Sequence, residues 1–128
     1  NSHHGLTNAV VMPYVLVFNR PAIEDRICAL ARLLALDNPG FDGFLDWVME
    51  LRREVGIPND LSALGVSSTE LPGLSQAAAI DPTAATNPIP VSPGILEKLY
   101  AAALAGDLVG PAELGVRVYG NELNESRG

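Results

Sequence analysis

The sequence is short of the residues from which many functional sites are built. It has one cysteine, Cys28, in 128 residues, which excludes an internal disulfide framework and a metal site of paired cysteines. Its two histidines, His3 and His4, are adjacent near the start, so a catalytic triad with a histidine further along the chain is excluded. The sequence contains neither GxGxxG nor GxxxxGK[ST] and therefore no nucleotide-phosphate loop of its own.

Basic residues and long apolar runs are also scarce. Eight Lys and Arg stand against 15 Asp and Glu, a formal charge of −7, which argues against a nucleic-acid partner. The longest apolar run, residues 9–18, is interrupted by Pro13 and is about half of the roughly 20 residues that span a bilayer. No basic segment precedes this run and no cleavage site follows it. We therefore expect no membrane partner. The lack of cysteines for disulfides fits a reducing compartment, so we expect a cytoplasmic location.

What the chain has in excess is apolar residues. They make up 48% of the sequence, and the mean hydropathy of +0.20 is high for a small domain. At 128 residues the chain can bury a core without disulfides. Either it forms an unusually tightly packed helical domain, or it carries apolar faces that pack against something else.

The apolar residues recur at helical spacing between short Gly, Pro, Asn and Asp clusters, which predicts an all-α, multi-helix bundle. The expected helices cover residues 5–19, 21–34, 41–55, 70–80 and 93–105. Pro13 is expected to bend the first helix or to lie in its first turn. We expect Thr69 to cap the fourth helix, Ser92 to cap the fifth, and Gly56 to end the third.

The helical spacing also predicts which side chains face the core. The expected inward residues are Ile23, Ile27, Leu30, Ala31 and Leu34 in the second helix, Phe44, Leu45, Val48, Leu51 and Val55 in the third, and Ile95, Leu96, Leu99 and Leu104 in the last. Cys28 is expected to be a small buried side chain, Phe44 and Trp47 to pack in the core, and Arg52 and Arg53 to be solvated. Residues 1–106 form the predicted domain, and residues 107–128 a tail that is ordered only if it docks.

Two places could carry chemistry. The adjacent His3 and His4 are either a frayed or tag-derived end or the source of one metal ligand, because neighbouring side chains on a helix point about 100° apart. Asp81, Thr83, Thr86 and Asn87 form a polar loop between two helices, and Asp-Pro and Asn-Pro steps are typical of ordinary turns. The residues alone leave both questions open.

The segment His4-Gly5-Leu6-Thr7-Asn8-Ala9 followed by Pro13-Tyr14-Val15 is similar to a signature of the iron-containing (group III) alcohol dehydrogenase family. The similarity continues through Gly56-Ile57-Pro58 and Leu64-Gly65-Val66 to the loop at residues 81–90. It covers about residues 2–105 in order. The resemblance implies the all-helical C-terminal half of a dehydroquinate synthase-like architecture, a metal-binding domain that follows a dinucleotide-binding α/β domain.

In that family an Asp and three His hold a divalent ion, and the last of these histidines matches His4. The other ligands lie upstream of Asn1 in the family pattern, so the resemblance implies a fragment that is inactive alone. It further implies Fe²⁺ or Zn²⁺, NAD or NADP bound mainly by the missing N-terminal domain, an alcohol or aldehyde substrate, and a homo-oligomer. Such an enzyme transfers a hydride between substrate and nicotinamide.

By the same resemblance the loop at residues 81–90 lies near the active-site cleft, so Thr83 or Asn87 faces substrate. Where many relatives have Arg after Asn-Pro, this chain has Ile89, which weakens an anion-binding role there. The alternative to the dehydrogenase is a stand-alone helical interaction or oligomerisation module without catalysis.

Overall fold

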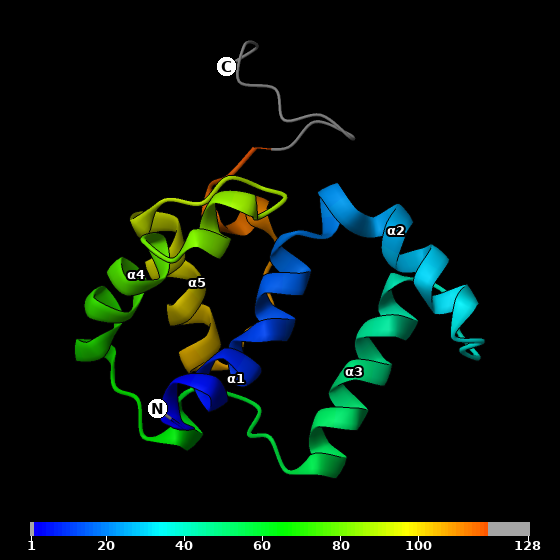
Figure 1. Ribbon diagram of the computed structural model, residues 1–128, viewed down its shortest axis with the longest axis horizontal. Helices are drawn as coiled ribbons and strands as arrows, with labels where there is room; N and C mark the ends of the chain where they lie inside the picture. The colour runs from blue at the N-terminus through cyan, green and yellow to red at the C-terminus, as the bar shows by residue number, and fades with distance from the viewer. Residues whose placement is uncertain (1, 118–128) are drawn as a thin grey trace.

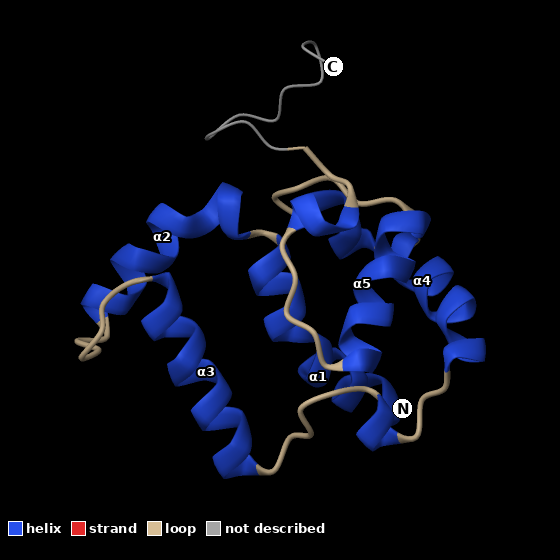
Figure 2. Ribbon diagram, turned by 180° about the vertical axis from the view of Figure 1, so that it is seen from behind, coloured by secondary structure: helices blue, strands red, loops and turns tan. Residues whose placement is uncertain are grey.

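The computed structural model describes residues 2–117, and within them the side chains of residues 5–81 and 84–117. Every regular element in residues 2–117 is helical, which confirms the all-α prediction (Figures 1 and 2). The α-helices are α1 (Ser2–Phe18), α2 (Arg20–Leu33), α3 (Phe41–Val55), α4 (Leu71–Ala79) and α5 (Pro93–Ala105), and the short 3-10 turns are η1 (Ser62–Leu64), η2 (Ser68–Glu70), η3 (Pro82–Thr86) and η4 (Pro111–Leu114). None of the described helices is long and apolar enough to cross a lipid bilayer.

Helices α3 and α5 begin and end at the predicted residues. The Ser92 hydroxyl accepts a hydrogen bond from the backbone N–H of Ile95 at 3.2 Å, which caps α5. Gly56 after α3 and Gly106 after α5 both have a φ of 83°, the left-handed conformation that glycine adopts without a steric penalty. Local capping therefore sets these helix ends.

The start of α4 differs from the prediction. Thr69 does not cap it, because the turn η2 intervenes and α4 begins at Leu71. The backbone N–H of Ser67 donates to the Glu70 carboxylate at 2.8 Å. A hydroxyl residue followed by glutamate three positions later is the capping-box spacing, so Ser67 opens the segment two residues earlier than expected.

Pro13 lies in the interior of α1, and the helix continues beyond it to Phe18. The alternative that places Pro13 in a first turn is therefore wrong. Proline has no N–H, so position 13 gives the carbonyl of Ala9 no helical hydrogen bond. The proline ring is itself fully buried. The interrupted turn of α1 thus lies inside the protein.

The larger core lies where α1 packs against α5 and the segment around η1 (Figure 1). Its buried members are Val10, Val11, Tyr14, Phe18, Leu61, Val66, Ile89, Leu99 and Ala103. Helix α4 packs on α5 from the far side. The predicted inward residues Leu96 and Leu99 are buried, and Ile95 and Leu104 are partly buried.

A smaller core joins α2 to α3, which lie side by side in both views (Figures 1 and 2). Its buried members are Ala31, Phe44 and Val48. Several residues predicted to face inward do not: the exposed fractions are 38% for Leu30, 42% for Leu34, 47% for Leu51 and 65% for Val55. Cys28 is half-buried, and Trp47 packs on Phe44 with 5.7 Å between ring centroids but is 40% exposed. The faces of α2 and α3 that point away from each other are thus only partly covered by the described residues.

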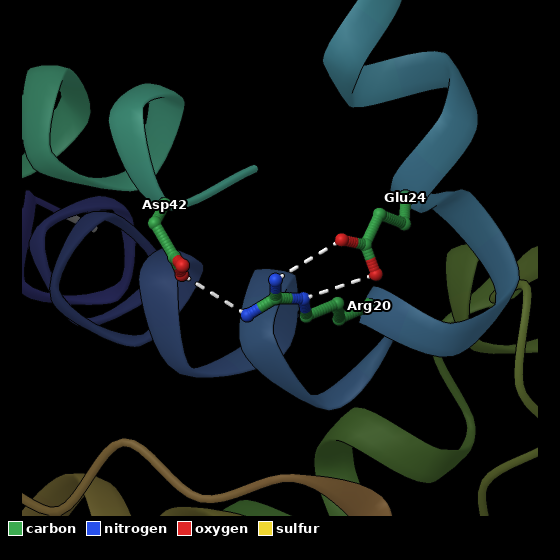
Figure 3. A network of polar contacts seen from close by, with 3 residues as sticks. All are labelled: Arg20, Glu24 and Asp42. Carbon is green, nitrogen blue, oxygen red and sulfur yellow. Dashed lines mark hydrogen bonds and ion pairs between the residues drawn. The ribbon is translucent and has the colours of Figure 1, made fainter. Parts of the chain in front are cut away.

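Arg20, at the start of α2, forms an ion pair with α3 (Figure 3). Its guanidinium contacts Glu24 at 3.0 Å within α2 and Asp42 of α3 at 3.0 Å. It also lies over the ring of Phe41, 4.5 Å from the centroid, a cation–π contact. The hydrogen bond from Arg20 holds the pKa of Glu24 below its ordinary value.

The prediction that Arg52 is solvated is wrong, whereas Arg53 is exposed as expected. Arg52 is only 3% exposed, and its guanidinium reaches the backbone of α1. Beyond α5, Pro111 is buried, and Leu114 and Val116 pack against the larger core. This part of the predicted tail is therefore docked, while its continuation, residues 118–128, lies outside the described residues.

Candidate functional site

A cavity of about 430 Å³ lies between α1, α4, α5 and the loop at residues 81–90. Its walls are mainly apolar, formed by residues such as Val11, Val15, Leu74, Ala78, Leu96 and Leu99. Met12 also lines it and is 43% exposed, so the cavity opens towards solvent along α1. Its size and lining are typical of a site for a small organic molecule.

Polar groups line two parts of this cavity. Thr7 and Asn8 come from the second turn of α1, and Asp81 and Asn87 come from the loop between α4 and α5. Thr7 and Asn8 lie three and four positions after His4, one helical turn along the same face. The cavity therefore borders the part of α1 that the sequence singles out.

Asn19 and Asn87 both line the cavity and form two hydrogen bonds with each other. The Asn19 amide nitrogen donates to the Asn87 oxygen at 2.9 Å, and the Asn87 nitrogen donates to the Asn19 oxygen at 2.8 Å. Asn87 also donates to the carbonyl of Ile89 at 2.6 Å, and the N–H of Ile89 donates to Asn19. This pair fixes the loop at residues 81–90 to the junction of α1 and α2. Asn87 thus lines the cavity, and its amide forms hydrogen bonds within the fold.

The tyrosine of the cavity is a neutral hydroxyl at physiological pH. Burial raises the pKa of Tyr100, and the negative charge of Asp81 raises it further. Tyr100 is therefore protonated near neutrality and is not a general base there. With apolar walls and mostly uncharged polar groups, the cavity suits an uncharged ligand better than an anion.

The predicted metal ligand is at the entrance of α1. The backbone of His4 lies in α1, whereas the side chains of residues 2–4 and of Thr83 lie outside the described residues. Among the side chains that the structure describes, no three or more His, Cys, Asp or Glu residues come together as a metal site. A neutral imidazole is nevertheless a suitable ligand for Fe²⁺ or Zn²⁺. The chain thus fits the role of contributing one ligand to a site that other residues complete.

Sequence reasoning missed two residues that organise α1, Arg52 and Tyr14. The Arg52 guanidinium donates to the carbonyl of Val10, and the Tyr14 hydroxyl donates to the carbonyl of Asn59 at 2.7 Å. Burial raises the pKa of Tyr14, although the nearby charge of Arg52 opposes this shift. The spacing of Arg52 on α3 contained no signal for its contact with α1, because 42 residues separate it from Val10.

Comparison with known proteins adds a family to this geometry. The model of the "Fe-containing alcohol dehydrogenase family, C-terminal" matches residues 1–104. Lactaldehyde reductase of Escherichia coli K12 is 29% identical over 109 residues, which are 80% of this chain and 28% of that protein. The probable alcohol dehydrogenase EutG of the same strain is 35% identical over 100 residues, or 78% of this chain and 25% of its own length.

Long-chain-alcohol dehydrogenase 1 of Geobacillus thermodenitrificans is 31% identical over 119 residues, which are 84% of this chain and 29% of that protein. The chain thus spans between a quarter and three tenths of the length of these relatives. Its helical fold and the run of the match from residue 1 to residue 104 agree with the resemblance of the segment that begins at His4. The chain belongs to the iron-containing alcohol dehydrogenase family and is similar to its C-terminal domain.

Proposed function

We propose that this chain is the C-terminal helical domain of a metal-dependent, NAD(P)-linked alcohol dehydrogenase, in which His4 supplies one ligand to a divalent ion. The observation that carries the proposal is the position of His4, in the family-matched segment and one helical turn before Thr7 and Asn8 at the cavity. The relatives named as reductases and dehydrogenases support the reaction type.

When bound, a divalent ion polarises the oxygen of an alcohol or carbonyl, while the nicotinamide carries the hydride. In the proposal, His4 holds that ion from the entrance of α1. By the resemblance, the other three ligands come from the part of the same helical domain that lies upstream of Asn1 in the family pattern, and a dinucleotide-binding domain precedes that part. NAD or NADP is bound mainly by that preceding domain, since this sequence has no dinucleotide loop.

The residues of the cavity have a separate role in the proposal. The apolar walls from α1, α4 and α5 exclude water from the carbon chain of the alcohol or aldehyde. Asn87, and Thr83 in the same loop, face the substrate from the side of the loop, with Asn87 oriented by its pairing with Asn19. Neutral donors and acceptors suit the uncharged hydroxyl of such a substrate.

Exposed apolar side chains support the proposal that this domain packs against more protein. Leu33 is 81% exposed, Ile80 is 84% exposed and Val55 is 65% exposed. In the proposal, these side chains are covered when the domain packs against more protein. The proposed partners are the nucleotide-binding domain and a second subunit of a homo-oligomer.

The test uses the two adjacent histidines in the dehydrogenase that contains this chain. His4→Ala is expected to lose the divalent ion and alcohol oxidation together while the fold survives, because a site loses a direct ligand. His3→Ala is the matched control and is expected to keep both. Metal content by elemental analysis and NAD(P)H production measure the outcome. Full metal occupancy in His4→Ala would contradict the proposal.

A second experiment tests whether the chain is sufficient. The purified 128-residue chain is expected to produce no NAD(P)H from alcohols with added Fe²⁺ or Zn²⁺, since one imidazole cannot hold the ion tightly. Measurable turnover by the chain alone would show that a preceding domain is not needed.

A further inference from the structure

The guanidinium of Arg52 is buried without an acidic partner. Arg52 lies on α3 and is 3% exposed. One of its terminal nitrogens donates to the carbonyls of Val10 at 3.1 Å and of Pro58 at 2.9 Å, and the other contacts the sulfur of Met49 at 3.1 Å. No carboxylate of the described residues forms an ion pair with it, and its Nε has no hydrogen-bond partner there. Among the described residues, two backbone carbonyls and a thioether sulfur hold the cation.

Burying an unpaired cation is unfavourable for stability. A hydrophobic side chain of similar size at such a position is often neutral or stabilising in comparison. Arg52 is therefore better explained by what its hydrogen bonds hold in place than by a contribution to the free energy of folding. One of these hydrogen bonds, to the carbonyl of Val10, reaches the turn of α1 that precedes Pro13.

That turn lacks one helical hydrogen bond, because Pro13 has no N–H to donate to the carbonyl of Ala9. Arg52 joins it to α3 and to the connection after α3 through Val10 and Pro58. Tyr14, on the other side of Pro13, reaches the same connection through the carbonyl of Asn59 at 2.7 Å. Arg52 and Tyr14 together form what we call the proline clamp. It connects α1 to the end of α3 and to the segment that follows α3.

The position of α1 determines the position of the proposed site. His4 lies six residues before Val10, about 9 Å along the helix at 1.5 Å per residue. The same helix contributes Thr7, Asn8 and Met12 to the cavity. A small shift or rotation at Val10 would displace both the ligand position and one side of the cavity.

We propose that Arg52 is a positioning residue that holds the His4 helix in the register needed to bind the ion. The proposal rests on the proposed function of His4. It assigns to Arg52 no contact with metal, substrate or cofactor. Its action passes through the Val10 carbonyl and the backbone of α1.

The test compares three variants of the metal-loaded dehydrogenase that contains this chain. Arg52→Met keeps the volume but removes every donor, and Arg52→Lys keeps the charge with a donor that can reach a carbonyl. Val48→Ala damages the smaller core, against which Leu16 of α1 also packs, but leaves the hydrogen bond from Arg52 to Val10 in place. The measurements are the rate of metal loss to EDTA, the thermal midpoint, and kcat and KM separately.

Arg52→Met is expected to lose metal about 3- to 10-fold faster than the parent. This is less than the roughly 10- to 100-fold effect of a residue that is hydrogen-bonded to a metal ligand, because Arg52 acts through the backbone of α1. Arg52→Lys is expected to lie between the two, and kcat to fall more than KM rises. Val48→Ala is expected to lower the thermal midpoint while metal loss stays at the parental rate. Metal loss in Arg52→Met that is no faster than in Val48→Ala would overturn the proposal.

If Arg52→Met does not fold, Tyr14→Phe tests the proline clamp in its place. It removes only the hydroxyl that reaches Asn59 and is expected to speed metal loss about twofold, a smaller effect in the same direction, since one neutral hydrogen bond is lost. A parental rate of metal loss in Tyr14→Phe would then count against the clamp.

If His4→Ala retains its metal, the proposed function fails. If His4→Ala loses metal while Arg52→Met behaves like Val48→Ala, only the positioning role fails.

Discussion

The two helical groups of this molecule are stabilised in different ways. Helices α1, α4 and α5 share the larger core, in which Phe18, Leu61 and Ile89 are fully buried. The α2–α3 pair shares only three buried residues and depends in addition on the contacts of Arg20 with Glu24 and Asp42. One group is fixed by packing, and the other by a small core with charged contacts at its surface.

The residues of the proposed site and the residue proposed to position them lie in different helical groups. The cavity, the Asn19–Asn87 pair and the family-matched segment at His4 belong to the α1, α4 and α5 group or its borders. The α2–α3 pair contributes Arg52, which reaches across to α1. Since local stability follows buried apolar contact, we expect α2 and α3 to open more readily than α1 and α5. Their amide hydrogen exchange should show this directly.

The largest effect is expected in the larger core. Phe18→Ala should lower the free energy of unfolding by about 3–5 kcal/mol, because it leaves a cavity in a fully buried position. Urea unfolding followed by circular dichroism measures it. Leu33→Ala, at a side chain that is 81% exposed, is the control and should change stability by less than about 0.5 kcal/mol. Equal losses in the two variants would contradict the contrast between core and surface.

A smaller effect, confined to the α2–α3 pair, is expected for Gly43→Ala. A Cβ at position 43 would lie 1.7 Å from the backbone oxygen of Asn38, so the corner before α3 must shift. The expected loss is about 1–3 kcal/mol, as for other overpacked sites. The fluorescence of Trp47, the one tryptophan, reports the unfolding of this pair.

Gly73→Ala in α4 is the matched control for this substitution. Its Cβ would meet nothing within 4 Å, so the helix should gain about 0.5–1 kcal/mol from the change to alanine. The two glycine variants should therefore have opposite signs. A loss of stability in both would mean that the corner at Asn38 is not what limits position 43.

The smallest effect is expected at the surface contacts of α2 and α3. Glu24→Gln should cost about 0.2–1 kcal/mol at pH 7, the range of exposed ion pairs. Arg20 lowers the pKa of Glu24 below its ordinary 4.5, so the contribution is present above pH 4.5 and is lost as the pH falls through the lower folded value. Unfolding of parent and variant across this range measures it. The difference should shrink in high salt, and one that persists in strong acid would argue against the ion pair.

The sequence predicted best those features that depend on neighbouring residues. The bounds of α3 and α5 follow from residues beside the helix ends, namely Gly56, Ser92 and Gly106. The start of α4 was misplaced because Ser67, Ser68 and Thr69 can each cap a helix, and only the carboxylate of Glu70 decides among them.

The sequence predicted least well those features that depend on distant residues. The partners of Arg52 are 42 residues away in Val10 and 6 residues away in Pro58, and helical spacing around Arg52 does not reveal them. The pairing of Asn19 with Asn87 spans 68 residues. Leu51 and Val55 were predicted to be buried but are exposed. Helical periodicity identifies the apolar face of α3, but it does not show whether another element covers that face.

The Asn19–Asn87 pair has a consequence for how the protein responds to its surroundings. Both partners are carboxamides, which neither gain nor lose a proton in water at ordinary pH and carry no net charge. Changes of acidity or ionic strength that loosen the Arg20 contacts therefore leave this junction intact. The loop beside the cavity is attached by uncharged hydrogen bonds, and its position should stay constant over conditions that loosen the contacts of the neighbouring Arg20.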